Sequence, residues 1–155
     1  WTSLKVQDCE NSMFTNTVGS VMQEQKALKA APETLVSEAA KLMAAKNVGA
    51  VMVTEDDCLI GILTERDVVF RVVARGLDAQ ATRVADVMTR APVTVDPDKP
   101  FGYALRVMQE KGFRHLPVVK DGKPIGIISS RTALDPDLEE FVAEANRRKH
   151  FEKTR

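Results

Sequence analysis

The chain has 155 residues, of which 44% are apolar and 28% charged, and its 22 basic and 22 acidic residues leave no net charge at pH 7. A chain of this length can bury one ordinary core, and without a basic excess it is not expected to bind the backbone of nucleic acids. Its apolar runs, such as residues 49–53, fall far short of the ~20 residues that span a bilayer. We therefore expect a globular, cytoplasmic protein that binds neither nucleic acid nor membrane.

The sulfur-containing residues and histidines suggest no metal site. Cys9 and Cys58 form no metal-binding spacing, and the two histidines, His115 and His150, are remote from both in the sequence. We expect two reduced, structural thiols. Four methionines lie on predicted apolar faces and are interpreted as core residues: Met22, Met43, Met88 and Met108.

An internal repeat organises the chain. Residues 32–66 superimpose without a gap on residues 97–131, so that Gly61 meets Gly126. The pair Val21-Met22 meets Val87-Met88 after a slip of one residue. Two tandem copies of one unit are therefore predicted, over residues 19–80 and 81–135.

In chain order, the polar residues 1–18 predict an irregular arm. Apolar residues at helical spacing over 35–43 predict an amphipathic helix that ends near Asn47. The β-prone runs 50–54 and 59–63 flank a polar turn and predict a hairpin. A valine-rich helix over 65–75 follows.

The second copy repeats this order. Pro100 near the first turn and Gly112 at the end delimit a helix, and Asp121-Gly122 joins two predicted strands over 116–120 and 125–128. Each unit thus reads β-α-β-β-α. Residues 136–155 begin acidic and end basic, which predicts a C-terminal helix whose basic end we interpret as a solvated terminus rather than a docking patch.

The sharpest local motif is the segment from Gly61 to Asp67. Thr64 and Asp67 have the spacing of a capping box, which alone would explain both residues. The same geometry suits a nucleotide, because a helix N-terminus attracts phosphate and a carboxylate can accept both ribose hydroxyls. The motif by itself leaves both interpretations open.

Its context resembles a tandem pair of CBS domains, the Bateman module, over about residues 18–135. The resemblance rests on the two Val-Met pairs, the matching Pro32 and Pro97, and the segments 48–53 and 113–119. It implies an α/β (α+β) fold of two repeats related by pseudo-two-fold symmetry, followed here by the C-terminal helix.

The resemblance also implies a ligand and its contacts. Such pairs bind adenosyl ligands in clefts between the repeats, and we expect AMP first, with ADP, ATP, NAD or S-adenosylmethionine as alternatives. By resemblance, Asp67 takes the ribose hydroxyls and Thr64 lies near the phosphate. The other expected contacts are Arg114, His115 and Arg131 to phosphate, and Pro92, Val93, Ile62 and Phe113 around the adenine.

The second cleft departs from the family pattern. Thr132 stands where the carboxylate would be, and Gly49-Ala50 stand where the first cleft has Arg114-His115. Each missing charge-assisted hydrogen bond is worth on the order of 1.5–3 kcal/mol. We expect this cleft to be empty or weak, and hence one nucleotide per chain.

The resulting prediction is a regulatory module that senses an adenine nucleotide, has no catalytic activity, and shifts its own conformation or that of an unidentified effector protein. The apolar excess of Val68, Val69, Val72 and Val73, together with the C-terminal helix, predicts a homodimer. Two alternatives remain open: a constitutive dimerisation scaffold with empty clefts, and an enzyme subunit that supplies a nucleotide site to a neighbour.

Overall fold

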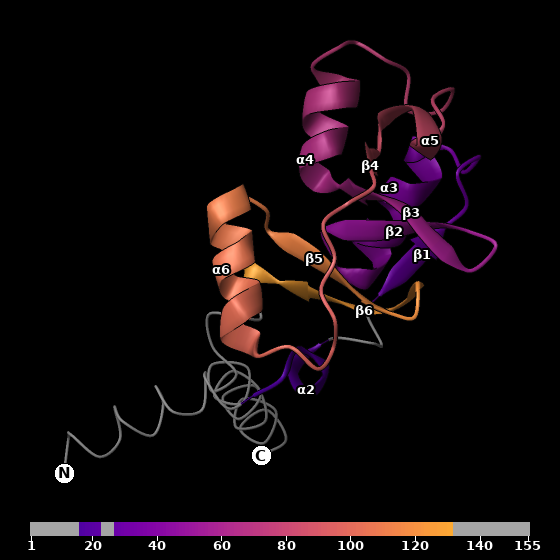
Figure 1. Cartoon of the computed structure of the whole chain (residues 1–155). Helices are drawn as coiled ribbons and strands as arrows, with labels where there is room; N and C mark the ends of the chain where they lie inside the picture. Colours follow the sequence, from indigo (N-terminus) through magenta and orange to yellow (C-terminus); the bar gives the residue numbers. More distant parts are fainter. Residues whose placement is uncertain (1–15, 23–26, 132–155) are drawn as a thin grey trace, which may run out of the picture.

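The computed structural model describes residues 16–22 and 27–131, and two helices of 11 residues occupy matching places in its two units (Figure 1). Helix α3 (Val36–Lys46) ends at Asn47 with a φ of 52°, and α6 (Phe101–Lys111) ends at Gly112 with a φ of 70°. Both ends are left-handed caps, as predicted. Leu42 differs from the prediction: it is 43% exposed, because the buried stripe of α3 runs through Val36, Ala39 and Met43.

Each unit contains the predicted antiparallel hairpin. In the first, β2 (Ala50–Glu55) pairs with β3 (Cys58–Thr64), and in the second, β5 (His115–Lys120) pairs with β6 (Lys123–Ser129). The two central residues of each turn have positive φ: 50° and 62° at Asp56-Asp57, and 52° and 77° at Asp121-Gly122. These values are typical of the tight turns that match the twist of a hairpin.

The strand that opens each copy is regular only in the first. There, β1 (Leu28–Ala30) runs parallel to β2, whereas the second copy has only an isolated parallel bridge from Val95 to Val118. The predicted opening strand at Pro92 and Val93 is thus irregular, because proline donates no hydrogen bond to a sheet. Instead β4 (Thr89–Arg90) pairs with β3 and extends the first sheet to the order β1-β2-β3-β4.

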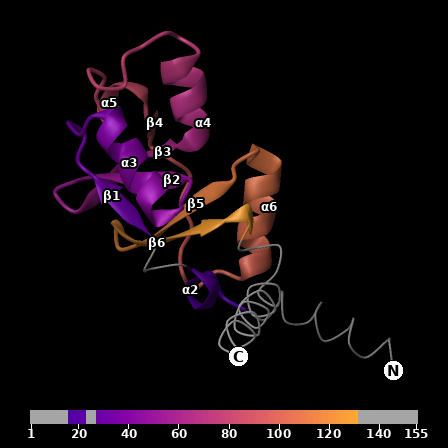
Figure 2. The same cartoon turned by 180° about the vertical axis from the view of Figure 1, so that it is seen from behind.

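The two copies exchange their opening turns. Helix α5 (Val84–Val87) packs into the core of the first unit, and α2 (Val18–Val21) packs into the core of the second, beside α6 (Figure 2). A side chain at Gly61 would overlap the sulfur of Met88, and one at Gly126 would lie 2.9 Å from the sulfur of Met22. Gly61 and Gly126 therefore leave room for Met88 and Met22, the methionines that follow the exchanged turns.

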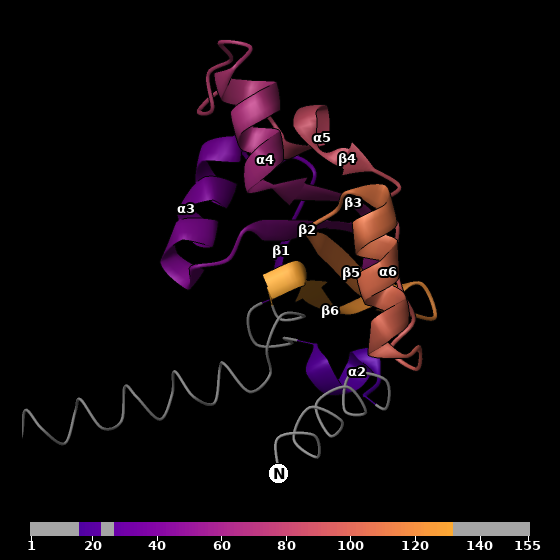
Figure 3. The same cartoon turned by 90° about the vertical axis from the view of Figure 1, so that its left-hand side faces the viewer.

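The strands of both units lie between α3 and α6, and β3 contacts β6 across the junction (Figure 3). Buried side chains fill one core on each side of this junction. The first core is formed by Val36, Ala39, Val53, Leu63, Val72, Val84, Val87 and Met88. The second is formed by Val18, Val95, Ala104, Met108, Leu116, Val118 and Ile128.

The predicted helix over 65–75 changes its winding. One turn of α-helix, α4 (Glu65–Asp67), continues into the π-helix η1 (Val68–Val73), where the Ala74 amide donates to the Val69 carbonyl at 2.8 Å. The wider winding buries Val72 but leaves Val69, Phe70 and Val73 between 51% and 67% exposed. Of the four valines predicted to form an apolar excess, Val69 and Val73 are thus exposed, whereas Val72 is buried in the first core and Val68 packs against it.

Several sequence predictions fall on residues 1–15, 23–26 and 132–155, which lie outside the described residues. They include most of the N-terminal arm, Cys9, Thr132, the C-terminal helix and His150. Val18, at the end of the predicted arm, is fully buried in α2. None of the helices in the described ranges combines the length and the apolar character that crossing a bilayer requires.

Candidate functional site

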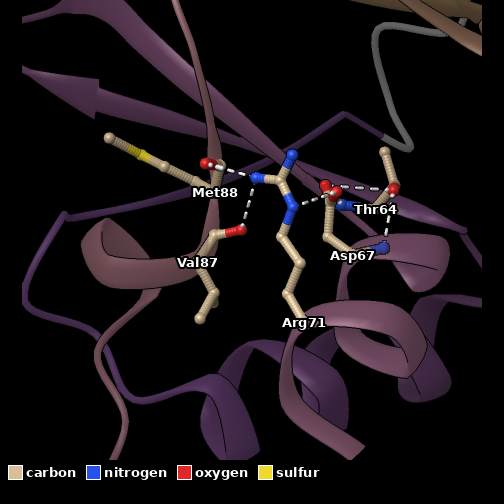
Figure 4. Close-up of polar contacts among 5 residues, drawn as sticks. All are labelled: Thr64, Asp67, Arg71, Val87 and Met88. Carbon is tan, nitrogen blue, oxygen red and sulfur yellow. Dashed lines mark hydrogen bonds and ion pairs between the residues drawn. The ribbon is translucent and has the colours of Figure 1, made fainter. Parts of the chain in front are cut away.

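The strand-to-helix junction at Thr64 is a complete capping box (Figure 4). Oγ1 of Thr64 accepts a hydrogen bond from the Asp67 amide at 3.2 Å. In return, Oδ2 of Asp67 accepts from the Thr64 amide at 3.0 Å and from the Thr64 hydroxyl at 3.1 Å. The two predicted site residues are therefore held together, and the carboxylate of Asp67 is only 12% exposed.

A third residue, Arg71, completes this cluster and was not predicted from the sequence. Its Nε lies 3.7 Å from Oδ1 of Asp67, and its Nη1 donates to the carbonyls of Val87 and Met88 at 3.2 and 3.0 Å (Figure 4). Arg71 follows Asp67 by one helical turn, a spacing at which opposite charges meet on a helix. The spacing of Asp67 and Arg71 could therefore have indicated this ion pair from the sequence.

The basic residues gather at the open end of the β5–β6 hairpin. Arg114 precedes β5, His115 begins it opposite Ser129, and Arg131 follows β6. The amide of Ser130 donates to the carbonyl of Arg114 at 2.8 Å, which fixes the two chain segments beside each other. Arg114 and Arg131 are exposed and His115 is half-buried, so three side chains able to carry positive charge share this end of the second unit.

The electrostatics of His115 link the two units. Burial lowers the pKa of His115 below its usual 6.5, the nearby carboxylate of Glu65 opposes that shift, and Arg114 adds to it. Glu65 begins α4 in the first unit, whereas His115 and Arg114 belong to the second. The helix that carries Asp67 therefore starts close to the basic end of the other copy.

The residues predicted to surround the adenine lie on three segments. Ile62 is buried in β3 and pairs with Thr89 of β4. Pro92 and Val93 follow β4 and are half-buried, and Val93 packs against the core of the second unit. Phe113, beside Arg114, is 38% exposed.

The two halves of the predicted site are not joined by an ion pair. Within the described ranges, Asp67 pairs with Arg71 and with none of Arg114, His115 and Arg131. The structure thus brings Thr64 and Asp67 together, and separately gathers the basic residues. The contact of β3 with β6 and the proximity of Glu65 to His115 connect the two groups.

The residues of the first unit that match the basic end of the second have the same backbone hydrogen bond but different side-chain charges. The Glu65 amide donates to the Gly49 carbonyl at 3.0 Å, which matches the bond between Ser130 and Arg114. The carboxylate of Glu65 lies against Gly49, where a side chain would meet its Cδ at 3.1 Å. A cation that sequence reasoning overlooked, Arg66, is the counterpart of Arg131, and its guanidinium stacks 5.0 Å from the ring centroid of Phe70.

The two repeated units agree with the comparisons with known proteins. The family model of the CBS domain matches residues 18–74 and 84–136. The chain belongs to the CBS-domain family and carries a tandem pair of these domains.

Among its relatives, the Meiotically up-regulated gene 70 protein of Schizosaccharomyces pombe is 41% identical over 129 residues, which cover 76% of this chain and 18% of that protein. A solved structure described as a putative signal-transduction protein with CBS domains, from Burkholderia ambifaria, superimposes with a TM-score of 0.72 at 34% identity and covers 77% of this chain and 91% of that one.

A second solved structure, CBSX2 in complex with AMP, superimposes with a TM-score of 0.67 at 29% identity and covers 80% of this chain and 97% of that one. The chain spans about a fifth of the length of the first curated relatives that it matches. Its fold and family are therefore those of a CBS pair, as the sequence predicted.

Proposed function

We propose that this CBS pair binds one adenine nucleotide, with AMP preferred, at the junction of its two units. The observation that carries the proposal is the state of the Asp67 carboxylate. Oδ2 already accepts two hydrogen bonds from Thr64, whereas Oδ1 has only an ion pair at 3.7 Å. Each carboxylate oxygen can accept about two hydrogen bonds, so Oδ1 retains room for the ribose 2′- and 3′-hydroxyls.

The phosphate is proposed to meet Arg114, His115 and Arg131. Arginine binds phosphate oxygens with two parallel hydrogen bonds, and histidine adds a donor whose charge depends on pH. Glu65 lies nearby and weakens the positive potential there. This balance favours a nucleotide with few phosphate charges, and the AMP complex of CBSX2 supports the same choice.

The adenine ring is proposed to lie against Ile62, Pro92, Val93 and Phe113. Pro92 and Val93 belong to the segment between β4 and the Val95 bridge, which passes from the first unit into the second. Ligand contacts on both units would favour one relative arrangement of the units over others. By linkage, nucleotide concentration then sets the population that an effector protein recognises, with no catalytic step by this chain.

Self-association is proposed to accompany binding. Val69, Phe70 and Val73 of η1 and the nearby Leu77 expose large apolar side chains, each between 45% and 67% exposed. We call this set the η1 face. Burying it against a second copy would remove an apolar patch from water, which favours a homodimer.

A second candidate is a dimerisation scaffold whose nucleotide place stays empty. The capping box favours it, because Thr64 and Asp67 satisfy each other without any ligand. The two candidates differ in one observable: a scaffold is not stabilised by nucleotide, whereas a sensor gains about 2.7 kcal/mol at a ligand concentration 100 times its dissociation constant.

The experiment is a thermal-shift screen with AMP, ADP, ATP, NAD and S-adenosylmethionine, followed by calorimetry with AMP and adenosine. A sensor binds AMP more tightly than adenosine, and Arg114→Gln together with added salt reduces that difference. Arg106→Gln is a matched control, because Arg106 is an exposed cation on α6 whose pair with Glu110 is open to solvent. No shift with any of the five compounds would favour the scaffold.

A further inference from the structure

Arg71 joins two segments that the proposed function assigns to different parts of one ligand. At one side its Nε pairs with Oδ1 of Asp67, the proposed ribose acceptor. At the other side its Nη1 donates to the carbonyls of Val87 and Met88, which lead directly into β4. We propose that Arg71 is a positioning residue for the adenosine half of the site: it orients Asp67 and sets its distance from the adenine segment. This inference rests on the proposed function.

The contact with Asp67 is not needed for the helix cap. The capping box is closed by Oδ2, by the hydroxyl of Thr64 and by two backbone amides, none of which involves Arg71. Arg71 acts on Oδ1, the oxygen left over for a ligand. With one oxygen held by Thr64 and the other by Arg71, the plane of the carboxylate is fixed before any ligand arrives, which lowers the cost of ordering it on binding.

The hydrogen bonds from Arg71 to the carbonyls of Val87 and Met88 position the segment that is proposed to contact the adenine. Met88 is immobilised on its far side, since its sulfur packs against Gly61 of β3. Thr89 and Arg90 then pair with Ile62 and Gly61, and the chain continues to Pro92 and Val93. A guanidinium suits this junction, because its rigid fork can serve a carboxylate and two carbonyls at once.

Arg71 is poised between two groups. It lies in η1, four residues after Asp67, and its guanidinium lies between the carboxylate of Asp67 and the carbonyls of Val87 and Met88 (Figure 4). Its side chain is 40% exposed, so its contribution to folding is limited by solvent screening. An effect on ligand geometry is therefore separable from an effect on stability.

The test compares AMP with 2′-deoxy-AMP, which lacks one hydroxyl that Asp67 would accept. The variants are Arg71→Gln, Arg71→Lys and the control Arg75→Gln, which removes an exposed cation further along the same segment. A part-buried ion pair contributes about 1 kcal/mol, so Arg71→Gln should weaken AMP binding about fivefold. The affinity for 2′-deoxy-AMP should fall less, so the preference for AMP shrinks.

Rescue and coupling complete the test. Arg71→Lys restores a charge beside Oδ1 and should recover part of the preference for AMP, while Arg75→Gln should bind as the parent does. In an Asp67→Asn background, Arg71→Gln should have little further effect, because an NH2 group replaces the charged oxygen with which Arg71 pairs.

The outcomes separate the two proposals. If the parent binds none of the adenosyl compounds, the proposed function fails and the inference fails with it. If the parent binds AMP and Asp67→Asn weakens binding, yet Arg71→Gln binds as the parent does or loses both nucleotides equally, the inference alone is overturned. A thermal melt of each variant identifies any that fails to fold, and Arg71→Lys then decides.

Discussion

Replacing Asp67 separates the role of a ligand group from that of a helix cap. Asp67→Ala removes the capping box, which costs about 1 kcal/mol of folding free energy. Asp67→Asn is the sharper variant, because its amide oxygen can still accept from the amide and hydroxyl of Thr64 as Oδ2 does now. In place of Oδ1 it carries an NH2 group, so it loses the charge and the acceptor that face Arg71 and the ribose.

For Asp67→Asn we expect AMP affinity to fall by about 1.5–3 kcal/mol, or about ten- to a hundredfold, since hydrogen bonds to a charged group have that worth. Isothermal calorimetry well below the melting temperature measures the affinity, and a thermal melt without ligand measures stability. Asp67→Asn should melt close to the parent, and Asp67→Ala lower. If Asp67→Asn binds AMP as tightly as the parent, Asp67 is a helix cap only.

Three further predictions follow from other parts of the fold. Val73→Glu places a charge on the η1 face, where Val73 is 67% exposed, and light scattering should show monomers in place of the parent's dimers; a monomeric parent at micromolar concentration contradicts the proposed interface. Gly61→Ala should lower the free energy of unfolding by about 1–3 kcal/mol in denaturant titrations, because its methyl overlaps the Met88 sulfur; an unchanged midpoint would contradict that packing. The lowered pKa of His115 means that the unfolded chain binds the proton more tightly, so the contribution of His115 to stability is present above pH 6.5 and is lost as the pH falls through the folded value. His115→Gln should remove this part of the pH dependence in melts, and an identical pH profile for the two proteins would refute it.

Much of the fold could be predicted from the sequence because its signals are local. Asn47 and Gly112 end helices through left-handed backbone, and the Asp-Asp and Asp-Gly turns close hairpins through positive φ. Such preferences depend on a few neighbouring residues. The internal repeat strengthened these predictions, because helix-ending and turn-forming residues recur at matching positions in both copies.

The features that escaped prediction depend on distant parts of the chain. The exchange of α2 and α5 between cores brings Val18 beside Val95, and Val84 beside Val36, which no local pattern indicates. The opening strand of the second copy looked regular, but prolines and the pairing of β4 with β3 reduced it to one bridge at Val95. The hydrogen bonds of Arg71 reach the carbonyls of Val87 and Met88 across the same kind of long separation.

The sequence predicted the local contact of Thr64 with Asp67, whereas the roles of the candidate residues toward a ligand stay a prediction. The spacing of Thr64 and Asp67 indicated the capping box that the structure shows, and the repeat indicated which residues match in the two copies. Glu65 escaped because its influence on His115 exists only where the two units meet. Pairwise electrostatics of this kind depend on tertiary contact rather than on sequence spacing.

The most direct measurement of the central claim is a calorimetric titration of the parent chain with AMP, with adenosine titrated in parallel. We expect close to one AMP per chain, and weaker binding of adenosine, because the proposed site combines the carboxylate of Asp67 with the basic end at Arg114, whereas Thr132 stands where the second cleft would need a carboxylate. Two equal sites per chain, equal affinity for AMP and adenosine, or no binding of either compound would contradict it.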